Sequence, residues 1–401
     1  KQGEGFRYHG RDLALLRGQM EGATVVLGSA TPALTSYQRA LDQQTGLLEL
    51  DCRVAARPMP DVELIDMTAS PFGSILSEAL YQALEENLAA GHQSLLLLNR
   101  RGFAPFLLCA DCGLSFHCPN CDITLTYHRR ELALRCHYCD FQQRPPEVCP
   151  RCQGHQLDPE GVGTERLEAQ LEELFPQARI ARMDRDSMGR KDAHRHLVAR
   201  IAAGEVDILV GTQMVAKGHD FPGVTLVGVV NADATLNFPD FRAAERTFSL
   251  LSQVAGRAGR GEQPGRVLIQ TYAPEHYALT SAAAHDYQGF FAEETTFRRE
   301  LGYPPFGWLV NLVLSGNNQQ AVERTAQRIA GQLRQGAGRV EVLGPASCLL
   351  PKLRGKWRQQ VLLKGAQRSD VRRRLAILPQ IEKLVPRGVS LVVDVDPVDM
   401  F

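Results

Sequence analysis

Residues 207–233 read "DILVGTQMVAKGHDFPGVTLVGVVNAD", two short apolar runs joined by a loop that contains glycine and charged residues. The runs DILVG and VTLVGVV are rich in β-branched residues without polar alternation, which is typical of parallel strands buried on both faces. Glycine in the intervening loop allows the backbone to approach a phosphate group closely. This stretch therefore predicts a parallel α/β sheet with an anion-binding loop between two of its strands.

The same alternation extends in both directions from this stretch. We expect helices at residues 77–90, 164–175 and 193–204, and strands at 94–99, 178–184, 206–211, 224–230 and 266–272. Residues 23–36, "ATVVLGSATPALTS", also begin like a strand. Residues 99–160 interrupt the alternation, which indicates an inserted module.

Length, charge and hydropathy limit the classes of protein that need to be considered. A chain of 401 residues predicts two to four domains when a domain takes about 100–200 residues. The formal net charge is zero, so binding to nucleic acid would have to depend on local basic patches. No apolar run approaches the roughly 18 residues of a membrane span, and residues 1–17 do not form a signal peptide. We therefore expect a cytoplasmic protein, in which cysteines stay reduced.

Eight of the ten cysteines form four Cys-x-x-Cys pairs inside the predicted insert. Two such pairs can place four thiolates around one tetrahedral Zn²⁺ ion, which closes the site to catalysis. The predicted ligands of two Zn²⁺ ions are Cys109, Cys112, Cys118, Cys121, Cys136, Cys139, Cys149 and Cys152. The isolated Cys52 and Cys348 are predicted to be buried as small apolar residues.

The pairing of these knuckles is open at the level of sequence. A nested arrangement, with the two middle pairs on one ion and the two outer pairs on the other, is favoured by the ribbon-like gap between Cys121 and Cys136. Sequential pairing is the competing geometry. A redox dithiol is the alternative function, although it normally needs one pair rather than four in series. Replacement of a cysteine ligand by His117, His128 or His137 is a further alternative.

The octapeptide "QVAGRAGR" at residues 253–260 places Arg257 and Arg260 on one side of an expected helix start. Guanidinium groups in this position can clamp a γ-phosphate as its charge develops. A surface ion pair is the plain alternative for two isolated arginines. The preceding "GTQ" at residues 211–213 and "KGHDFP" at residues 217–222 make the phosphate interpretation the stronger one.

This set of motifs resembles superfamily 2 helicases: motif III in "SAT", motif IV near "LLLLNRRG", motif V in residues 211–233 and motif VI in "QVAGRAGR". With the eight cysteines between motifs IV and V, the chain is similar to the zinc-containing replication-restart helicases of this superfamily. The resemblance implies a RecA-like lobe with a parallel sheet and an inserted two-zinc module. The residues after 301 themselves predict a small C-terminal α+β domain of βαββαβ order, with helices at 319–334 and 370–384. It also implies an ATP-dependent 3′-to-5′ DNA helicase that recognises stalled forks and D-loops and initiates primosome assembly.

The resemblance assigns roles to individual residues. It makes Arg260 the arginine finger, with Arg257 and Gln253 beside it on the nucleotide. In motif V, Gly218 and Asp220 would face ATP and Mg²⁺, while Thr212 and Lys217 would contact the translocating strand. Ser29 and Thr31 would couple hydrolysis to DNA movement. The implied partners are branched and single-stranded DNA, the single-stranded DNA-binding protein, PriB and DnaT, at the nucleoid.

The family pattern is incomplete in this chain. The sequence contains neither the phosphate loop G-x-x-x-x-G-K-[ST] nor an Asp-Glu-x-His box. We therefore expect that a segment upstream of Lys1 supplies the remaining ATP and Mg²⁺ contacts, and that this chain alone does not hydrolyse ATP.

The sequence also predicts surfaces that face DNA. Residues 351–374 carry nine Lys or Arg residues and one acid, and Lys356, Trp357 and Arg358 are the expected contacts. The arginines could instead be solvated, and Trp357 could fill a small core. Residues 236–241 suggest a projecting wedge between motifs, with a packed connector as the alternative.

These expectations give a domain plan. Residues 1–50 would end a first helicase lobe, 51–102 and 156–300 would form the second lobe, 103–155 the zinc module and 301–401 a DNA-binding domain. Two competing functions stay open, a non-catalytic zinc and DNA-binding adaptor with a degenerate helicase lobe, and a DNA translocase without a role in restart.

Overall fold

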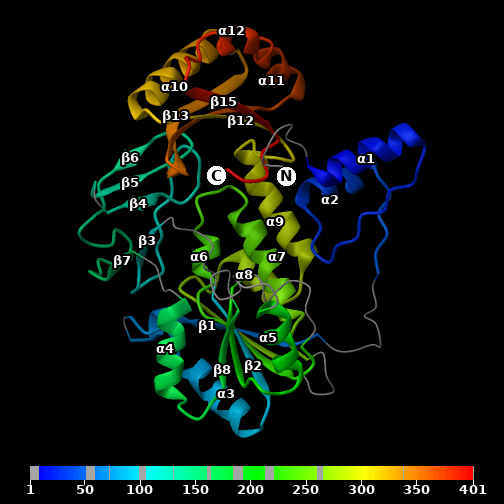
Figure 1. The fold of residues 1–401 in the computed structure, drawn as a ribbon, viewed down its shortest axis with the longest axis vertical. Coiled ribbons are helices and arrows are strands. Elements are labelled where there is room, and N and C mark those ends of the chain that lie inside the picture. The colour runs from blue at the N-terminus through cyan, green and yellow to red at the C-terminus, as the bar shows by residue number, and fades with distance from the viewer. Residues whose placement is uncertain are drawn as a thin grey trace. The chain divides into compact units, whose positions relative to one another are not determined.

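A computed structural model describes residues 9–50, 59–71, 73–98, 105–129, 131–159, 164–183, 193–212, 221–259, 265–336 and 338–400 (Figure 1). The chain divides into two compact units. The sheet unit comprises Leu48–Arg135 and Gln142–Glu294, and the C-terminal unit comprises Lys1–Leu47, Cys136–Phe141 and Thr295–Phe401. None of the helices in the described ranges has both the length and the apolar character that a membrane span requires.

The sheet unit is built on a six-stranded, fully parallel sheet with the strand order β1-β11-β10-β2-β9-β8. In this order, the strands are Asp61–Asp66, Arg266–Thr271, Val224–Val229, Gln93–Leu97, Ile208–Gly211 and Ile180–Met183. The predicted parallel sheet is confirmed. Strand β1 was not predicted, because its side chains alternate between exposed and partly buried positions instead of forming an apolar run.

The helices of the sheet unit include the three predicted ones. These are α3 (Glu78–Ala89), α4 (Thr164–Leu174) and α5 (Ala193–Ala202). Helices α6 (Asp233–Leu236), α7 (Ala243–Ala255), α8 (Tyr277–Ala283) and α9 (Tyr287–Glu300) follow, with a short 3₁₀ turn, η2, at Met67–Ala69. Ser77 caps α3 by accepting a hydrogen bond from the amide of Leu80, which explains why this helix begins at Glu78.

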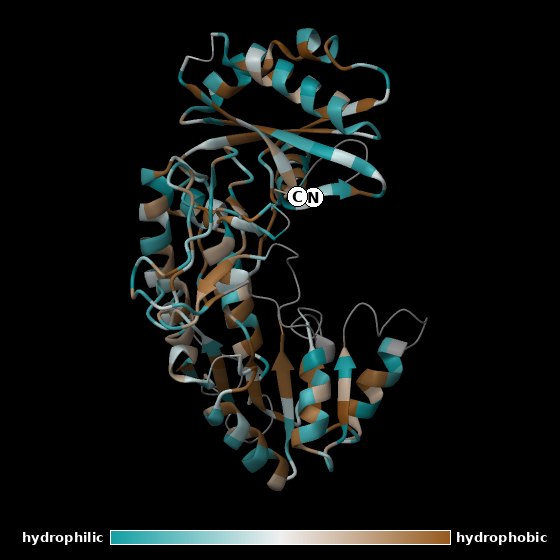
Figure 2. Cartoon of the chain, turned by 90° about the vertical axis from the view of Figure 1, so that its left-hand side faces the viewer, coloured by the Kyte–Doolittle hydropathy of each residue, from teal (hydrophilic) through white to brown (hydrophobic). Residues whose placement is uncertain are grey.

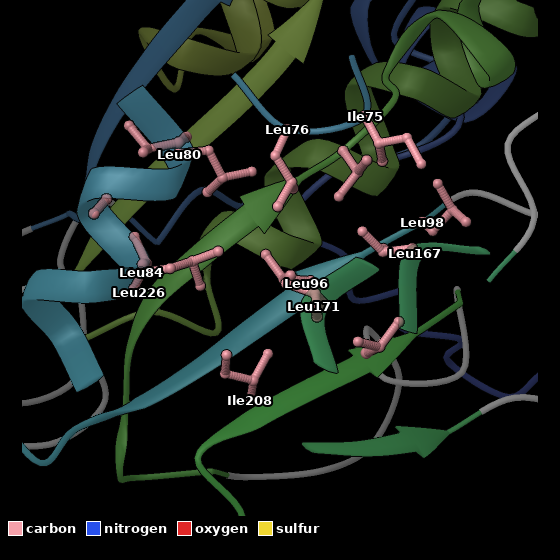
Figure 3. Close-up of a cluster of buried hydrophobic side chains, with 14 of the residues drawn as sticks. Ile75, Leu76, Leu80, Leu84, Leu96, Leu98, Leu167, Leu171, Ile208 and Leu226 are labelled. Carbon is pink, nitrogen blue, oxygen red and sulfur yellow. The ribbon is translucent and has the colours of Figure 1, made fainter. Parts of the chain in front are cut away.

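Apolar side chains from α3, α4 and the sheet form one core cluster (Figure 3). Leu80 and Leu84 of α3 and Leu96 of β2 are fully buried in it. Gly228 of β10 allows this packing, because a β-carbon there would lie 2.5 Å from Cδ2 of Leu96. The strands at the bottom of Figure 2, which belong to this sheet, are largely hydrophobic, as expected when helices cover both faces.

The predicted insert folds as short strands outside the parallel sheet. Strand β3 (Leu107–Cys109) pairs with β7 (Leu157–Pro159), so the two ends of the insert lie side by side. Between them, β4 (Thr126–His128), β5 (Ala133–Arg135) and β6 (Gln142–Gln143) form an antiparallel ribbon. The insert therefore leaves the sheet and returns to it without disturbing strand order.

The C-terminal unit contains a four-stranded antiparallel sheet with the order β13-β14-β12-β15. Its elements follow the predicted βαββαβ order: β12 (Trp308–Gly316), α10 (Gln319–Arg334), β13 (Val340–Leu353), β14 (Lys356–Gly365), α11 (Arg368–Leu375), α12 (Leu378–Glu382) and β15 (Val389–Val395). Helices α10 and α11 cover one face of the sheet and bury a second core cluster. One prediction was wrong in detail, since the helix expected at residues 370–384 is two helices, with Pro379 in the first turn of α12.

The prediction of a strand from residue 23 onward is wrong. Helices α1 (Gly10–Glu21) and α2 (Leu34–Leu41) flank this segment, which has no regular secondary structure. Val26 is 79% exposed and Leu27 is 48% exposed. A strand is stabilised only by pairing with neighbours, and none of the described strands pairs with this segment.

Candidate functional site

Helix α7 leads into the arginine-bearing turn of motif VI. The helix ends at Ala255, and its exposed Gln253 donates a hydrogen bond to the Ser249 hydroxyl at 3.0 Å. Arg257 follows in the turn, partly buried, with its amide donating to the carbonyl of Val254. The expectation of a helix start is therefore wrong, because the motif lies at the end of a helix. Arg260 lies outside the described residues.

The turn that contains Arg257 lies beside the beginning of strand β10. The amide of Gly259 donates to the carbonyl of Val224 at 3.4 Å. Gly265, which precedes β11, packs so closely here that a β-carbon would lie 2.4 Å from the amide nitrogen of Gly259. Because β10 lies within motif V, this contact brings the strand of motif V next to motif VI.

The other predicted nucleotide and DNA residues of motif V are only partly described. Thr212 follows β9 at its carboxyl end and is partly buried. Lys217, Gly218 and Asp220 lie outside the described residues. In the C-terminal unit, Ser29 accepts a hydrogen bond from the amide of Thr31 through its hydroxyl, which forms a local turn.

A buried carboxyl group, which the sequence analysis did not single out, follows strand β10. Asp233 is 1% exposed and accepts hydrogen bonds from the Thr271 hydroxyl and the Tyr272 amide, each at 3.0 Å. Burial, reinforced by the charge of Asp66, raises the pKa of Asp233 to about 6. The sequence feature that could have indicated this group is an acidic residue shortly after an apolar strand, where the loops at the end of a sheet can bury a carboxyl group.

The segment predicted as a wedge is a packed connector. Asn237, Phe238 and Asp240 are each buried, and helix α6 occupies the start of the segment. Asp240 accepts a hydrogen bond from the amide of Arg242 and pairs with Arg246 at 3.0 Å. The turn residues of this segment therefore lead into helix α7 and do not form a projecting element.

The eight cysteines come together as two groups of four. The outer group contains Cys109, Cys112, Cys149 and Cys152, and the inner group contains Cys118, Cys121, Cys136 and Cys139; the sulfur atoms of each group lie within 4.8 Å of one another. This is the nested arrangement, and no histidine is a member of either group.

The spacing of the sulfur atoms fits zinc. In the outer group, the Cys109 and Cys152 sulfurs are 3.7 Å apart and the Cys112 and Cys149 sulfurs are 3.6 Å apart. A tetrahedral ion with Zn–S bonds of about 2.3 Å requires sulfurs about 3.8 Å apart. The residues therefore fit two structural zinc sites, each closed by four thiolates and open to no substrate.

All four knuckles share one backbone conformation. In each, the amide four residues after the first cysteine donates to the carbonyl of that cysteine, and the amide of that cysteine donates to the carbonyl five residues on. The residue after the second cysteine has a positive φ in every case: Gly113 (70°), Asp122 (51°), Asp140 (69°) and Gln153 (62°). Each cysteine pair is therefore preorganised for the metal by its own hydrogen bonds.

The predicted DNA-facing residues lie at the end of a long hairpin in the C-terminal unit. Strands β13 and β14 are joined by a two-residue turn in which Arg354 and Gly355 both have positive φ. Lys356 is exposed, whereas Trp357 and Arg358 are partly buried. The ammonium group of Lys352 lies 5.0 Å from the centre of the Trp357 ring, where it makes a cation–π contact.

Fold and site together define a helicase-type RecA-like lobe with an inserted zinc module and a C-terminal α+β domain. Comparison with family models agrees for each part. The helicase conserved C-terminal domain matches residues 162–262, the PriA DNA helicase Cys-rich region matches residues 118–144, and the primosomal protein N C-terminal domain matches residues 299–398.

Curated relatives match almost the whole chain. Replication restart protein PriA of Bacillus subtilis is 43% identical over 406 aligned residues, which are 99% of this chain and 50% of the relative. PriA of Haemophilus influenzae is 40% identical over 402 residues, which are 100% of this chain and 55% of the relative. This chain belongs to the PriA family of replication restart proteins. It spans about half the length of the curated relatives it matches.

Among solved structures, RecG bound to a three-way DNA junction is a distant neighbour. It is 15% identical, with a TM-score of 0.36, over 67% of this chain and 26% of that chain.

Proposed function

We propose that this chain supplies the second RecA-like lobe, the zinc module and the C-terminal domain of an ATP-dependent 3′-to-5′ DNA helicase. In this role it acts at stalled forks and D-loops, where it initiates primosome assembly. The observation that carries the proposal is the contact of Gly259 with Val224. It places the turn of Arg257 beside the start of strand β10, which follows the glycine-containing loop of motif V in the sequence, and this supports a shared role of the two motifs in binding a nucleoside triphosphate.

The catalytic roles follow from charge. Arg260 would stabilise the charge that develops on the γ-phosphate, with Arg257 and Gln253 orienting the nucleotide. Gly218 and Asp220 would lie on the ATP and Mg²⁺ side of motif V, and Thr212 and Lys217 on the DNA side. Ser29 and Thr31 would couple hydrolysis to strand movement. A chain without a phosphate loop lacks the cradle that holds the β-phosphate, so we propose that it does not hydrolyse ATP by itself.

The remaining parts would handle DNA and partners. We propose four parts for these tasks: the end of a first lobe at residues 1–50, a second lobe at 51–102 and 156–300, a zinc module at 103–155 and a DNA-binding domain at 301–401. Lys356, Trp357 and Arg358 would contact branched or single-stranded DNA through phosphate neutralisation and stacking. The single-stranded DNA-binding protein, PriB and DnaT are the proposed protein partners, and the nucleoid within the cytoplasm is the proposed location.

The test is DNA-stimulated ATP hydrolysis by this chain fused to the half of the Bacillus subtilis relative that lies outside the match. We expect activity only in the fusion, with a loss of about 100-fold or more on Arg260→Ala. Gln253→Ala is a milder comparison at the same motif. Equal turnover with and without Arg260 would mean that the motif is structural and would favour the non-catalytic adaptor. Turnover by the unfused chain would overturn the proposed division of the ATP site.

A further inference from the structure

The zinc knuckle at residues 136–141 packs against the C-terminal sheet, although its contacts with that sheet join residues 210 and 223 positions apart in the sequence. Both belong to the same compact unit. The first residue between the knuckle's cysteines, His137, is 2% exposed, and the second, Tyr138, is 1% exposed. In the second and fourth knuckles both intervening residues are exposed (Pro119, Asn120, Pro150 and Arg151). Burial of both residues in this knuckle therefore indicates a role beyond metal binding.

Hydrogen bonds join this knuckle to strands β13 and β14, and a further bond links the β14 partner to β12. The His137 ring donates through Nδ1 to the carbonyl of Ser347 on β13 at 2.8 Å. The Gln360 side chain on β14 donates to the carbonyl of His137 at 2.7 Å. Asn311 on β12 donates to the Gln360 side-chain oxygen at 3.2 Å, which fixes the orientation of the amide. Gln360 and Asn311 are 1% and 2% exposed, so no water replaces these bonds.

The knuckle also lies against the backbone of strand β13. Gly344 of β13 has a φ of 84°, and a β-carbon there would lie 3.4 Å from the carbonyl oxygen of Tyr138. Strand β13 is an edge strand of the C-terminal sheet. The knuckle thus bonds a backbone carbonyl, that of Ser347, on an edge strand where such groups would otherwise be unpaired.

We propose that the zinc ion of the inner group acts as a clamp for the C-terminal domain by shaping the knuckle that holds strands β13 and β14. Cys136 and Cys139 are ligands in this group. Without a cation, four thiols cannot stay this close as thiolates, so the knuckle loses the restraint that presents His137 to the sheet. His137 and Gln360 are positioning residues in this scheme. The outer group, whose cysteines lie in the sheet unit, has no such role.

The buried thiol of Cys348 provides the readout. This residue follows Ser347 on the edge strand and is 0% exposed, and burial raises the pKa of its thiol to about 11. Because Cys348 directly follows Ser347, release of the Ser347 carbonyl from His137 should loosen the edge strand at Cys348. We expect this to expose the thiol and return its pKa towards the ordinary value, so that alkylation accelerates. Peptide mapping after treatment with iodoacetamide measures Cys348 separately from the ligand cysteines.

The experiment compares two matched double variants of the whole chain. Cys118→Ser with Cys121→Ser removes the inner metal without changing the knuckle itself, and Cys149→Ser with Cys152→Ser removes the outer metal. We expect Cys348 to react at least about tenfold faster in the inner variant and at the wild-type rate in the outer variant. Slow labelling in both variants, or equally fast labelling in both, would overturn the proposal.

A second pair of variants decides the matter if the inner variant loses its overall fold, as detected by hydrogen exchange in β2 and β10. Gln360→Ala removes the donor to His137, whereas Gln359→Ala changes the neighbouring residue, which bonds the Ser347 hydroxyl instead. Faster labelling of Cys348 in Gln360→Ala than in Gln359→Ala supports the clamp, and equal rates contradict it. None of these measurements involves DNA or ATP, so the result is independent of the proposed helicase function.

Discussion

Gly113 faces the carbonyl oxygen of Tyr272 so closely that a β-carbon on Gly113 would lie 1.9 Å from it. Gly113 follows Cys112 in the first zinc knuckle, and Tyr272 directly follows strand β11 of the parallel sheet. The outer metal group is therefore seated against the end of a core strand. Glycine is required at this position for two reasons: the backbone has a positive φ, and the two backbones approach too closely for a side chain.

Gly113→Ala should destabilise the sheet unit by about 3 kcal/mol or more, because it adds a steric clash to the cost of a left-handed alanine. Gly91→Ala is the matched control, since Gly91 has a φ of 72° and nothing within 4 Å of the added β-carbon. We expect about 1–2 kcal/mol for the control. Urea unfolding measures both values, and equal losses would show that the contact with Tyr272 is unimportant.

The two metal groups should release zinc at different rates. In the outer group Cys152 is exposed and Cys112 is partly buried, whereas three of the four inner cysteines are buried. Organomercurial titration with a chromogenic chelator should therefore show one equivalent of zinc released at least about tenfold faster than the second. In the Cys149→Ser, Cys152→Ser variant only the slow phase should remain. A single phase in the wild type would contradict this order.

Asp233 should make stability fall as pH rises from 5 to 7.5. Its folded-state pKa of about 6 lies above the ordinary value of about 3.9, so protonation contributes stability that is fully present below pH 4 and lost through pH 6. Relative to Asp233→Asn, the unfolding free energy of the wild type should drop by about 1 kcal/mol over this range.

Urea unfolding at the two pH values tests this prediction, with the exposed Asp61→Asn as the control that should show no such difference. A constant gap between wild type and Asp233→Asn at both pH values would mean that the carboxyl is already ionised at pH 5.

The hairpin of β13 and β14 should contribute to DNA affinity by charge. Replacing Lys356 and Arg358 with alanine removes two candidate phosphate contacts, so the salt dependence of binding should become shallower by about 1.5–2 in log–log slope. Arg372→Ala with Arg373→Ala removes the same charge from the exposed face of α11. Fluorescence anisotropy with forked DNA at several salt concentrations separates the two, and equal slopes in both variants would assign the effect to overall charge.

Local sequence determined much of the fold and of the metal ligands. Helix α10 was predicted with its observed bounds, Gln319–Arg334. Its apolar periodicity and its Asn318 cap both depend on residues within this one segment. Strands β9 and β10 were predicted for the same reason, as short apolar runs between turn residues. Each Cys-x-x-Cys knuckle is likewise a local structure, closed by its own backbone hydrogen bonds.

Relations between distant segments could not be derived in this way. The apolar run after residue 23 was misread as a strand, and the turn residues near Pro239 were misread as a wedge, because local composition does not reveal which neighbours are present. The gap between Cys121 and Cys136 favoured nested pairing without excluding the sequential order, and the structure confirmed nesting. Only the tertiary structure showed that Gly113 meets Tyr272 and that His137 meets Ser347 and Gln360. Hydrophobic periodicity and backbone turns are set by residues a few positions apart, but pairing and docking depend on where the whole chain brings their partners.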